Sequence, residues 1–515
     1  MRKNIKLKIK NELVDNKKYF ILSCIISTYV FISLFITVTT IKGMIAIVAS
    51  IVILFIISKI SKIIFILFAI MTLLINSAIL HIGLHWGNTT IMSRIEVAAL
   101  SPKSESIEYL MTYLNMIDIF ILFYIVIGIF LIYKLLTQLK HSYKIVKVLS
   151  LFFLSIVLFI LYNLNLIKNV RSYNFIKQYI NVVDIEKILE RKNYLANLNH
   201  DLTNLNNDLH YDKIVIIMGE SANKHHMSAY NYSIKTTPFL DTLLENNNSF
   251  KYNVIAPTNQ TRYSIPITLT SATVDNFNRF FTTKSIITIF KEYGYRTYWL
   301  SNQGKVGMHE NYIGTIASEA DFEKTANLLY VDAKHDAVLI DYLNQINTSD
   351  KAKEVYFFHM MGSHNAYKKR YPKNSALFKN PKNVIEEYDN TIFYTDNILE
   401  KIYSRFKNSK LLFIYLSDHG EVVNVNKHGH GFFPAYQDEY DIPLIVYSSE
   451  VNERLIELQN LNKSSLLNME RFNNFIEYIV GIDTNISHIS TSSNVFTLKP
   501  NNIIDYNMLN KYQAD

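Results

Sequence analysis

The chain has 515 residues, of which 49% are hydrophobic and 19% are charged, and its formal net charge is +8. This composition excludes an intrinsically disordered protein, and the low glycine and proline content excludes a collagen-like or low-complexity chain. The single cysteine, Cys24, excludes an internal disulfide framework and a cysteine-ligated zinc site. Any metal ion must therefore be held by histidine, carboxylate or hydroxyl groups.

The first third of the chain carries most of the apolar residues. Five stretches have the length of membrane spans: Tyr19–Thr40, Met44–Ser58, Ile63–Leu80, Ile117–Leu136 and Val148–Ile167. The first is too long for a signal peptide and lacks a small-residue cleavage site, so we predict an anchor. Lysines between the spans favour a cytoplasmic amino terminus, and an odd number of spans then places the rest of the chain outside the cytoplasm.

The basic excess is concentrated at the amino terminus, where residues 1–18 contain seven Lys or Arg and two acidic residues. We interpret it as a membrane-topology signal, and we expect no nucleic-acid partner. Residues 170–205 follow with an amphipathic pattern. Such a segment either lies on the lipid surface or packs as a linker helix against the soluble domain, and the sequence leaves both alternatives open.

The remainder of the chain alternates apolar strands with helical patterns. Strands are predicted at Lys213–Met218, Arg296–Leu300, Glu354–His359, Leu411–Leu416 and Ile442–Tyr447. Helices are predicted at Pro238–Glu245, Ile286–Tyr293, Ala337–Gln345, Val384–Phe406 and Arg471–Val480. This alternation predicts a mostly parallel sheet with helices on both faces. We predict a transmembrane domain at 1–168, a bridging helical segment at 169–209 and a catalytic domain at 210–515.

Acidic residues and histidines gather where the predicted strands end. The segments are Gly219-Glu220-Ser221, His359–His364, Ser417–Glu421 and, shortly before the last strand, His428–Gly431. Ligands bind beyond the carboxyl ends of strands in open α/β sheets, so these groups are expected at one edge. Oxygen and nitrogen donors of this kind suit zinc, which activates a hydroxyl nucleophile and offsets phosphoryl charge. Each group alone also fits an ordinary turn, loop or helix-start residue, and we interpret His225-His226 as structural.

The nucleophile is less clear from the residues themselves. Ser221 lacks the flanking glycine of a G-x-S-x-G elbow. Thr261 lies in a polar turn that opens a predicted helix, where backbone donors suit a phosphate group. Thr258 is the second choice among the threonines.

Several motifs in combination resemble those of one family. They are Ile214–Ser221, Tyr230–Pro238, the His-Met-Met-Gly-Ser-His sequence at His359–His364 with Arg370-Tyr371-Pro372 after it, Tyr388–Asp396 and the Ser-Asp-His-Gly-Glu sequence at Ser417–Glu421. The whole chain resembles the bacterial phosphoethanolamine transferases, which are membrane-anchored members of the alkaline phosphatase and sulfatase superfamily. The resemblance implies an α-helical transmembrane bundle of about five spans, followed by an α/β periplasmic domain of alkaline phosphatase/sulfatase type.

The resemblance also implies roles for individual residues. Glu220, Thr261, Asp418 and His419 would bind zinc, with Thr261 as the nucleophile that becomes covalently modified. His364 and His430 would be catalytic, assisting proton transfer or holding a second zinc. His359, Asn302 and His428 would be substrate-binding. The chain departs from the lipid A members in its nucleophile segment, Asn259-Gln260-Thr261-Arg262 in place of Cys-Gly-Thr-x-Thr, and in its cysteine-free catalytic domain.

The function implied by this resemblance is phosphoethanolamine transfer at the bacterial inner membrane. Phosphatidylethanolamine would be the donor, and a lipopolysaccharide core sugar, lipid A or another glycan the acceptor. The departures favour a core sugar or another glycan. The alternatives are a phosphoglycerol transferase of the same superfamily, which acts on a periplasmic glycan, and a catalytically inactive membrane scaffold. One zinc ion is expected, and a second is possible.

Overall fold

The computed structural model describes residues 56–57, 62–86, 116–138, 185–197, 211–304, 310–326, 335–347, 352–498 and 502–512. The chain divides into two compact units; the described residues between 56 and 138 belong to the first, and the described residues from 185 to 512 belong to the second. The first unit contains helices α3 (Lys62–Trp86) and α6 (Met116–Gln138). The second unit contains all the strands of the described residues.

Helices α3 and α6 pack against each other, and a 2.6 Å contact joins His81 Nδ1 to Asp118 Oδ1. They include the third and fourth apolar stretches predicted as spans. Within the described residues, the structure contains no helix whose length and apolar character would let it cross a membrane. The predicted spans Tyr19–Thr40 and Val148–Ile167, and all but two residues of Met44–Ser58, lie outside the described residues.

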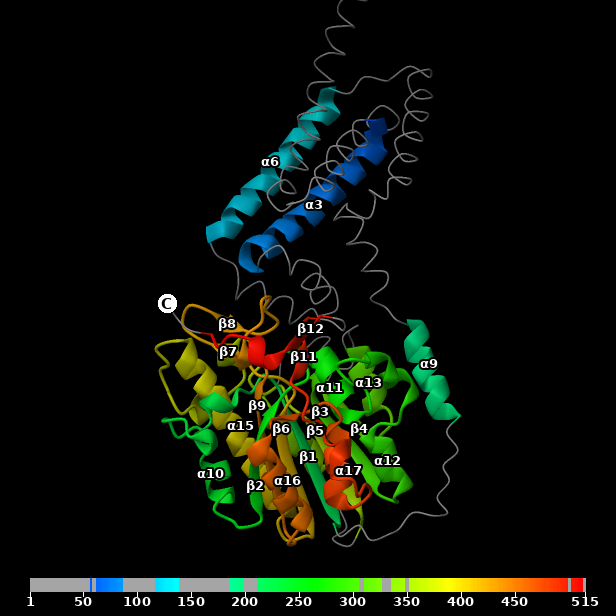
Figure 1. The fold of residues 1–515 in the computed structure, drawn as a ribbon. Coiled ribbons are helices and arrows are strands. Elements are labelled where there is room, and N and C mark those ends of the chain that lie inside the picture. Colours follow the sequence, from blue (N-terminus) through cyan, green and yellow to red (C-terminus); the bar gives the residue numbers. More distant parts are fainter. Residues whose placement is uncertain are drawn as a thin grey trace, which may run out of the picture. The chain divides into compact units, whose positions relative to one another are not determined.

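An eight-stranded sheet forms the centre of the second unit (Figure 1). Its strands are β1 (Lys213–Gly219), β2 (Ser249–Ile255), β3 (Arg296–Gly304), β4 (Phe322–Ala326), β5 (Glu354–His359), β6 (Leu411–Ser417), β9 (Asp441–Ser448) and β10 (Leu467–Asn468). They are arranged in the order β10-β2-β9-β6-β1-β5-β3-β4. Strand β9 pairs antiparallel with both β2 and β6, and the other strand pairs are parallel. The prediction of a mostly parallel sheet is confirmed.

Five of the eight strands lie where apolar runs predicted them. Strands β1, β6 and β9 are buried along their whole length, as expected for strands covered on both faces. The sequence analysis missed β2, β4 and the two-residue β10. Strand β2 alternates buried and exposed positions and carries Lys251 and Asn253, and β4 is a half-buried edge strand with Glu323 and Lys324. Neither β2 nor β4 is a continuous apolar run, so the apolar pattern does not predict them.

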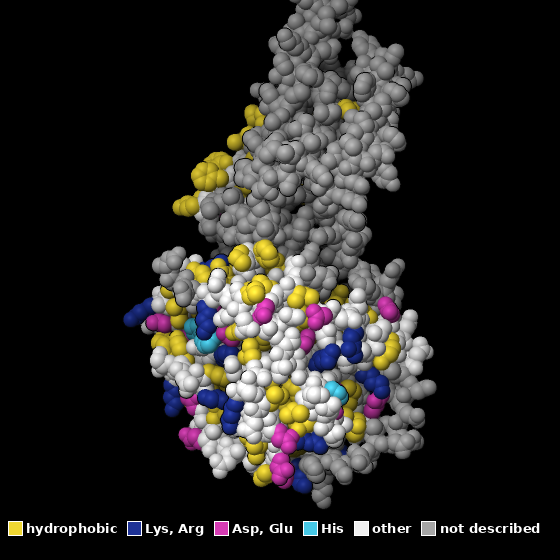
Figure 2. Space-filling model, in the orientation of Figure 1, with side chains coloured by type: hydrophobic (Ala, Val, Ile, Leu, Met, Phe, Trp, Pro, Cys, Tyr) yellow, Lys and Arg dark blue, Asp and Glu magenta, His cyan; other side chains and the backbone are white. Residues whose placement is uncertain are grey.

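Helices cover both faces of the sheet and form two separate cores (Figure 1). One core contains residues from α11 (Thr261–Leu269), α12 (Ile286–Glu292), α13 (Glu310–Ala317), α16 (Glu453–Ser464) and α17 (Phe472–Val480). The other contains residues from α10 (Pro238–Leu243), α14 (Val338–Asn344) and α15 (Val384–Phe406). Acidic and basic side chains are interspersed over the described surface in Figure 2.

Helix α9 (Ile185–Ala196) packs on the second unit against α13 and the short turn Phe277–Thr282. Arg191 on α9 is fully buried and forms a 2.6 Å ion pair with Glu319. Its guanidinium also donates to the carbonyl groups of Phe280 and Thr283. For residues 185–196, the structure therefore favours the linker helix packed against the soluble domain.

This ion pair leads to a stability prediction. Replacing Arg191 by Leu leaves the Glu319 carboxylate buried without its cation, and we expect unfolding to become easier by about 3 kcal/mol. The measurement is urea denaturation of the purified full-length protein. Lys192, the exposed neighbour on the same helix, provides the control, since Lys192→Leu should change stability by less than about 0.5 kcal/mol. Equal stability of the two variants would show that the Arg191–Glu319 ion pair does not stabilise this unit.

Candidate active site

The predicted site residues meet at one edge of the sheet because of the strand directions. Glu220 follows β1, and Asp418 and His419 follow β6, so all three lie at the carboxyl ends of parallel strands. Strand β9 runs in the opposite direction and therefore begins at this edge. The His428–Gly431 segment precedes β9, and the reversed strand explains how histidines before a strand reach the same place.

Four side chains that could act as metal ligands converge at this edge. The Thr261 hydroxyl lies 3.0 Å from Glu220 Oε2 and 3.2 Å from His419 Nε2. The same imidazole nitrogen lies 3.3 Å from Glu220 Oε1 and 3.5 Å from Asp418 Oδ2. Glu220, Asp418 and His419 are buried, whereas Thr261, the first residue of α11, is half-buried. The structure thus brings together the four residues that the sequence analysis assigned to zinc.

The geometry of this cluster fits a tetrahedral zinc ion. Oxygen and nitrogen ligands about 2.0–2.1 Å from zinc lie about 3.3–3.4 Å from one another, and the four separations given above run from 3.0 to 3.5 Å. His419 Nδ1 lies 2.8 Å from the carbonyl oxygen of Gly420. An N–H at Nδ1 would donate to that oxygen and leave the Nε2 lone pair facing the two carboxylates, as in histidines that bind metal ions.

The electrostatics of the cluster also favour a cation. Burial, together with the charge of Glu220, raises the pKa of Asp418 to about 7. Burial also disfavours the charged forms of Glu220 and His419, but the contact with His419 outweighs it for Glu220, and the charge of Asp418 together with the contact to Glu220 outweighs it for His419. The pKa of Glu220 falls well below its usual range, and that of His419 rises to about 10. Asp418 and His419 therefore retain protons near neutral pH that a divalent cation would replace, whereas Glu220 is already ionised.

Several neighbours hold the carboxylates in place. Gln303 Nε2 donates to Glu220 Oε2 at 3.1 Å, and Ser264 Oγ donates to the carbonyl oxygen of Asp418. Gly362 has φ +49° and approaches Glu220 so closely that a Cβ would lie 2.8 Å from its backbone N and O atoms. Gln303 is absent from the site residues predicted from sequence, although its place shortly after a predicted strand was the available signal. Gly362 appears in the sequence prediction only as part of the His359–His364 motif.

The alternative nucleophiles are placed differently. Ser221 is fully buried, has φ 56°, and its hydroxyl donates to Glu220 Oε1 at 2.7 Å. Thr258 is also fully buried, and its hydroxyl has no hydrogen-bond partner among the described residues. Thr261 is the most accessible of the three hydroxyl residues and the one that contacts both Glu220 and His419.

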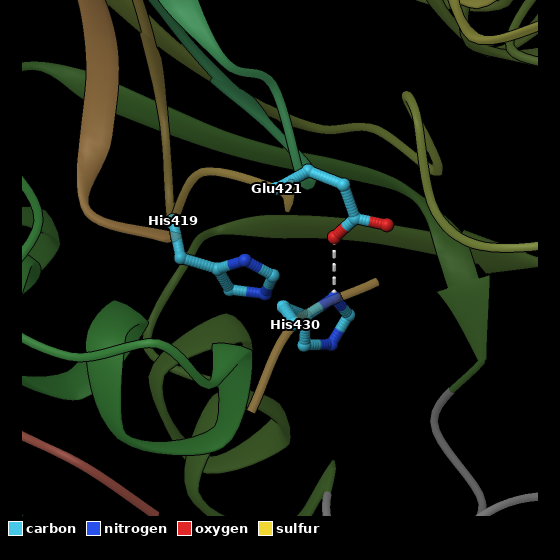
Figure 3. A group of neighbouring side chains, drawn as sticks. All are labelled: His419, Glu421 and His430. Atoms are coloured by element: carbon cyan, nitrogen blue, oxygen red, sulfur yellow. Dashed lines mark hydrogen bonds and ion pairs between the residues drawn. The ribbon is translucent and has the colours of Figure 1, made fainter. Parts of the chain in front are cut away.

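His430 lies beside the cluster, with its ring centroid 4.2 Å from that of His419 (Figure 3). Its Nδ1 atom is 2.7 Å from Glu421 Oε2, and Glu421 Oε1 accepts a hydrogen bond from the Tyr367 hydroxyl at 2.6 Å. His364 is next, with its ring centroid 6.1 Å from that of His430. His419, Glu421 and His430 also form a second group whose ligand atoms lie within 4.8 Å of one another.

The remaining predicted residues surround this centre. His359 is buried, contacts Ser301 Oγ at 3.2 Å, and burial lowers its pKa to about 4. Asn302 is fully buried and donates to Asp336, which also accepts hydrogen bonds from the backbone N–H groups of residues 361 and 362. His428 is half-buried on β8 (His428–Gly429).

The pair His225-His226 has structural partners, as the sequence analysis expected. His225 contacts Asp441 at 2.8 Å and His226 contacts Asp389 at 2.7 Å.

Comparison with known proteins gives relatives for the second unit. The family model described as Sulfatase matches residues 212–471. Phosphoethanolamine transferase EptA of Helicobacter pylori is 29% identical over 255 residues, which are 46% of this chain and 48% of that protein. Phosphoethanolamine transferase EptC of Escherichia coli is 26% identical over 259 residues, 46% of this chain and 45% of that protein. The matched region thus spans less than half the length of these relatives.

Solved structures show the same fold. The periplasmic domain of Escherichia coli EptC in complex with Zn aligns with a TM-score of 0.51 and 22% identity, covering 61% of this chain and 96% of that domain. The integral membrane protein lipooligosaccharide phosphoethanolamine transferase A of Neisseria meningitidis aligns with a TM-score of 0.57 and 16% identity. This alignment covers 89% of this chain and 95% of that protein. The likeness supports an α/β fold of the alkaline phosphatase and sulfatase type.

The cluster leads to a prediction about metal binding. We expect metal-free protein to bind zinc, and Glu220→Gln, Asp418→Asn and His419→Ala each to weaken binding by more than about 100-fold. Because the bound protons must leave, affinity should fall as the pH drops below about 7, and zinc binding should release protons. Isothermal titration calorimetry in buffers of different ionisation enthalpy measures both effects. His428→Ala is the control, and an equal loss of affinity in this variant would contradict the assignment.

Proposed function

Because the chain belongs to the sulfatase family, we propose that it is a zinc-dependent phosphoethanolamine transferase. The observation that carries the proposal is the position of Thr261. Its hydroxyl lies at the start of α11, within hydrogen-bond distance of both Glu220 and His419. The phosphoethanolamine transferases among its relatives support the choice of the transferred group.

The proposed reaction begins at Thr261. Zinc held by Glu220, Thr261, Asp418 and His419 would lower the pKa of the threonine hydroxyl and offset charge on the phosphoryl oxygens. The Thr261 proton is directed at Glu220 Oε2, the acceptor of its hydrogen bond. Thr261 Oγ forms a bond to the phosphorus of phosphatidylethanolamine, and the bond from phosphorus to the glycerol oxygen breaks. Backbone N–H groups at the start of α11 favour negative charge on the phosphoryl group.

The histidines on the other side of the cluster serve the leaving group and the acceptor. Diacylglycerol leaves as an alcohol and takes its proton from His430 or His364. In the second half-reaction, the acceptor oxygen forms a bond to phosphorus while the bond from phosphorus to Thr261 Oγ breaks. The same histidine takes the acceptor proton, and the proton that passed to Glu220 returns to Thr261 Oγ. The Glu421 carboxylate orients His430 through Nδ1 and leaves Nε2 for this exchange. Two steps of this kind constitute covalent catalysis with a stable intermediate.

The donor lipid and the acceptor follow from the proposed setting. The apolar stretches in residues 19–167 would anchor the chain in the inner membrane and place the catalytic domain in the periplasm. Phosphatidylethanolamine would then reach Thr261 from the outer leaflet of that membrane. The acceptor would be a sugar or phosphate of lipopolysaccharide.

The adduct on Thr261 is the first test of this proposal. Full-length protein loaded with zinc and incubated with phosphatidylethanolamine, without acceptor, should carry phosphoethanolamine on Thr261 in peptide mass spectrometry. Thr261→Ala should lose the adduct and all transfer. Thr261→Ser should retain part of both, because it keeps the hydroxyl group.

Thr258→Ala is the matched control, since it removes a buried threonine hydroxyl nearby, and it should keep the adduct. An adduct that persists in Thr261→Ala would exclude Thr261 as the nucleophile. Glycerophosphate on Thr261 in a mixed-lipid assay would identify a phosphoglycerol transferase.

A further inference from the structure

Glu439 is a fully buried carboxylate that contacts three segments of the site. It ends the short turn Gln437–Glu439, just before β9. Its Oε1 atom accepts hydrogen bonds from the Asn259 side-chain amide and from the backbone N–H of Phe432, both at 2.9 Å. Its Oε2 atom accepts one from the backbone N–H of Tyr436 at 2.8 Å.

These contacts reach each part of the site. Asn259 is two residues before Thr261, and Phe432 is two residues after His430. The carbonyl oxygen of Glu439 accepts a 2.9 Å hydrogen bond from Gly420, which follows His419. A Cβ at Gly420 would lie 2.3 Å from the carbonyl oxygen of Asp438, so the turn that contains His419 packs closely against the backbone of residues 438–439. One residue thus connects the nucleophile segment, a metal-ligand turn and the histidine loop.

Asn259 links Glu439 to the segment that carries Thr261. It is fully buried, and while its amide nitrogen donates to Glu439, its oxygen accepts a 3.2 Å hydrogen bond from the backbone N–H of Leu498. Both polar groups of this side chain are therefore engaged. The backbone at residue 259 is held between Glu439 and the carboxyl-terminal segment, two residues before the hydroxyl group that must meet Glu220 and His419.

We propose that Glu439 is a positioning residue. Through its hydrogen bond to Asn259, it keeps the Thr261 hydroxyl within hydrogen-bond distance of Glu220 and His419. The inference rests on the proposed function and extends it, since the side-chain hydrogen bonds described for Glu439 go to Asn259 and to two backbone N–H groups rather than to the metal-ligand side chains or to Thr261. Shifting a reacting group by about 1 Å lowers a rate by about 100-fold, so a lost hydrogen bond at this distance affects the chemical step. Substrate binding should change little, because the side chains of Glu439 and Asn259 are fully buried.

The experiment compares Glu439→Gln, Asn259→Ala and the double variant in the full-length, zinc-loaded protein. The glutamine amide keeps one acceptor oxygen, so its NH2 group faces either the Tyr436 N–H or both the Asn259 and Phe432 donors. Glu470→Gln is the matched control, because Glu470 is also a buried carboxylate and accepts hydrogen bonds from the Val274 N–H and the Ser490 hydroxyl. The rate of adduct formation on Thr261 is measured against donor concentration.

We expect each single variant to lower the maximal rate by about 10- to 100-fold, with KM for phosphatidylethanolamine within about twofold of wild type. The double variant should be no slower than the slower single variant, because both break the same connection. Glu470→Gln should react at the wild-type rate. Wild-type rates in both single variants, or losses that multiply in the double variant, would overturn the proposal.

Crystal structures of Glu439→Gln and Asn259→Ala provide a readout independent of turnover. Thr261 Oγ should move away from His419 Nε2 in both variants, and an unchanged separation would overturn the proposal. If wild-type protein forms no adduct on Thr261, the proposed function fails. The displacement of Thr261 in the variants then decides the positioning role of Glu439 by itself.

Discussion

Two carboxylates and an imidazole are buried together at the edge of the sheet, and the surrounding structure follows from this constraint. Charges of the same sign at Glu220 and Asp418 are unfavourable in a site with little water. The structure offsets this cost with donors: Gln303 and Ser221 bind Glu220, and backbone N–H groups of residues 221 and 419 bind Asp418. Glycines at 362 and 420 give these segments room to approach closely. A divalent cation at the centre would complete the balance of charge.

Sequence patterns predict the parts of this arrangement that depend on local order. Buried strands such as β1 and β6 are continuous apolar runs, and the polar residues directly after them belong to the site. The sheet topology then brings Glu220 and Asp418 together. Thr261 is harder to choose from sequence, because the hydroxyls of Ser221 and Thr258 have the same chemistry. The fold distinguishes them by exposure and by distance to His419.

Other features depend on contacts between distant segments, and no local pattern indicates them. Glu439 meets Asn259 across 180 positions of sequence, and the two are hydrogen-bonded because β9 is reversed and begins at the site. Gln303 reaches Glu220 across 83 positions. Arg191 is a similar case, since an arginine on an amphipathic helix is normally expected at the surface, and only the pocket containing Glu319 explains its burial.

The connection through Glu439 has a consequence for how the catalytic domain matures. Residues 210–515 contain no cysteine, so hydrogen bonds and no disulfide connect the nucleophile segment to the histidine loop. Such a connection forms as the chain folds and needs no disulfide-forming enzyme. Thiol reductants have no bond to cleave in this domain, so the geometry of its centre does not depend on the redox poise of the compartment.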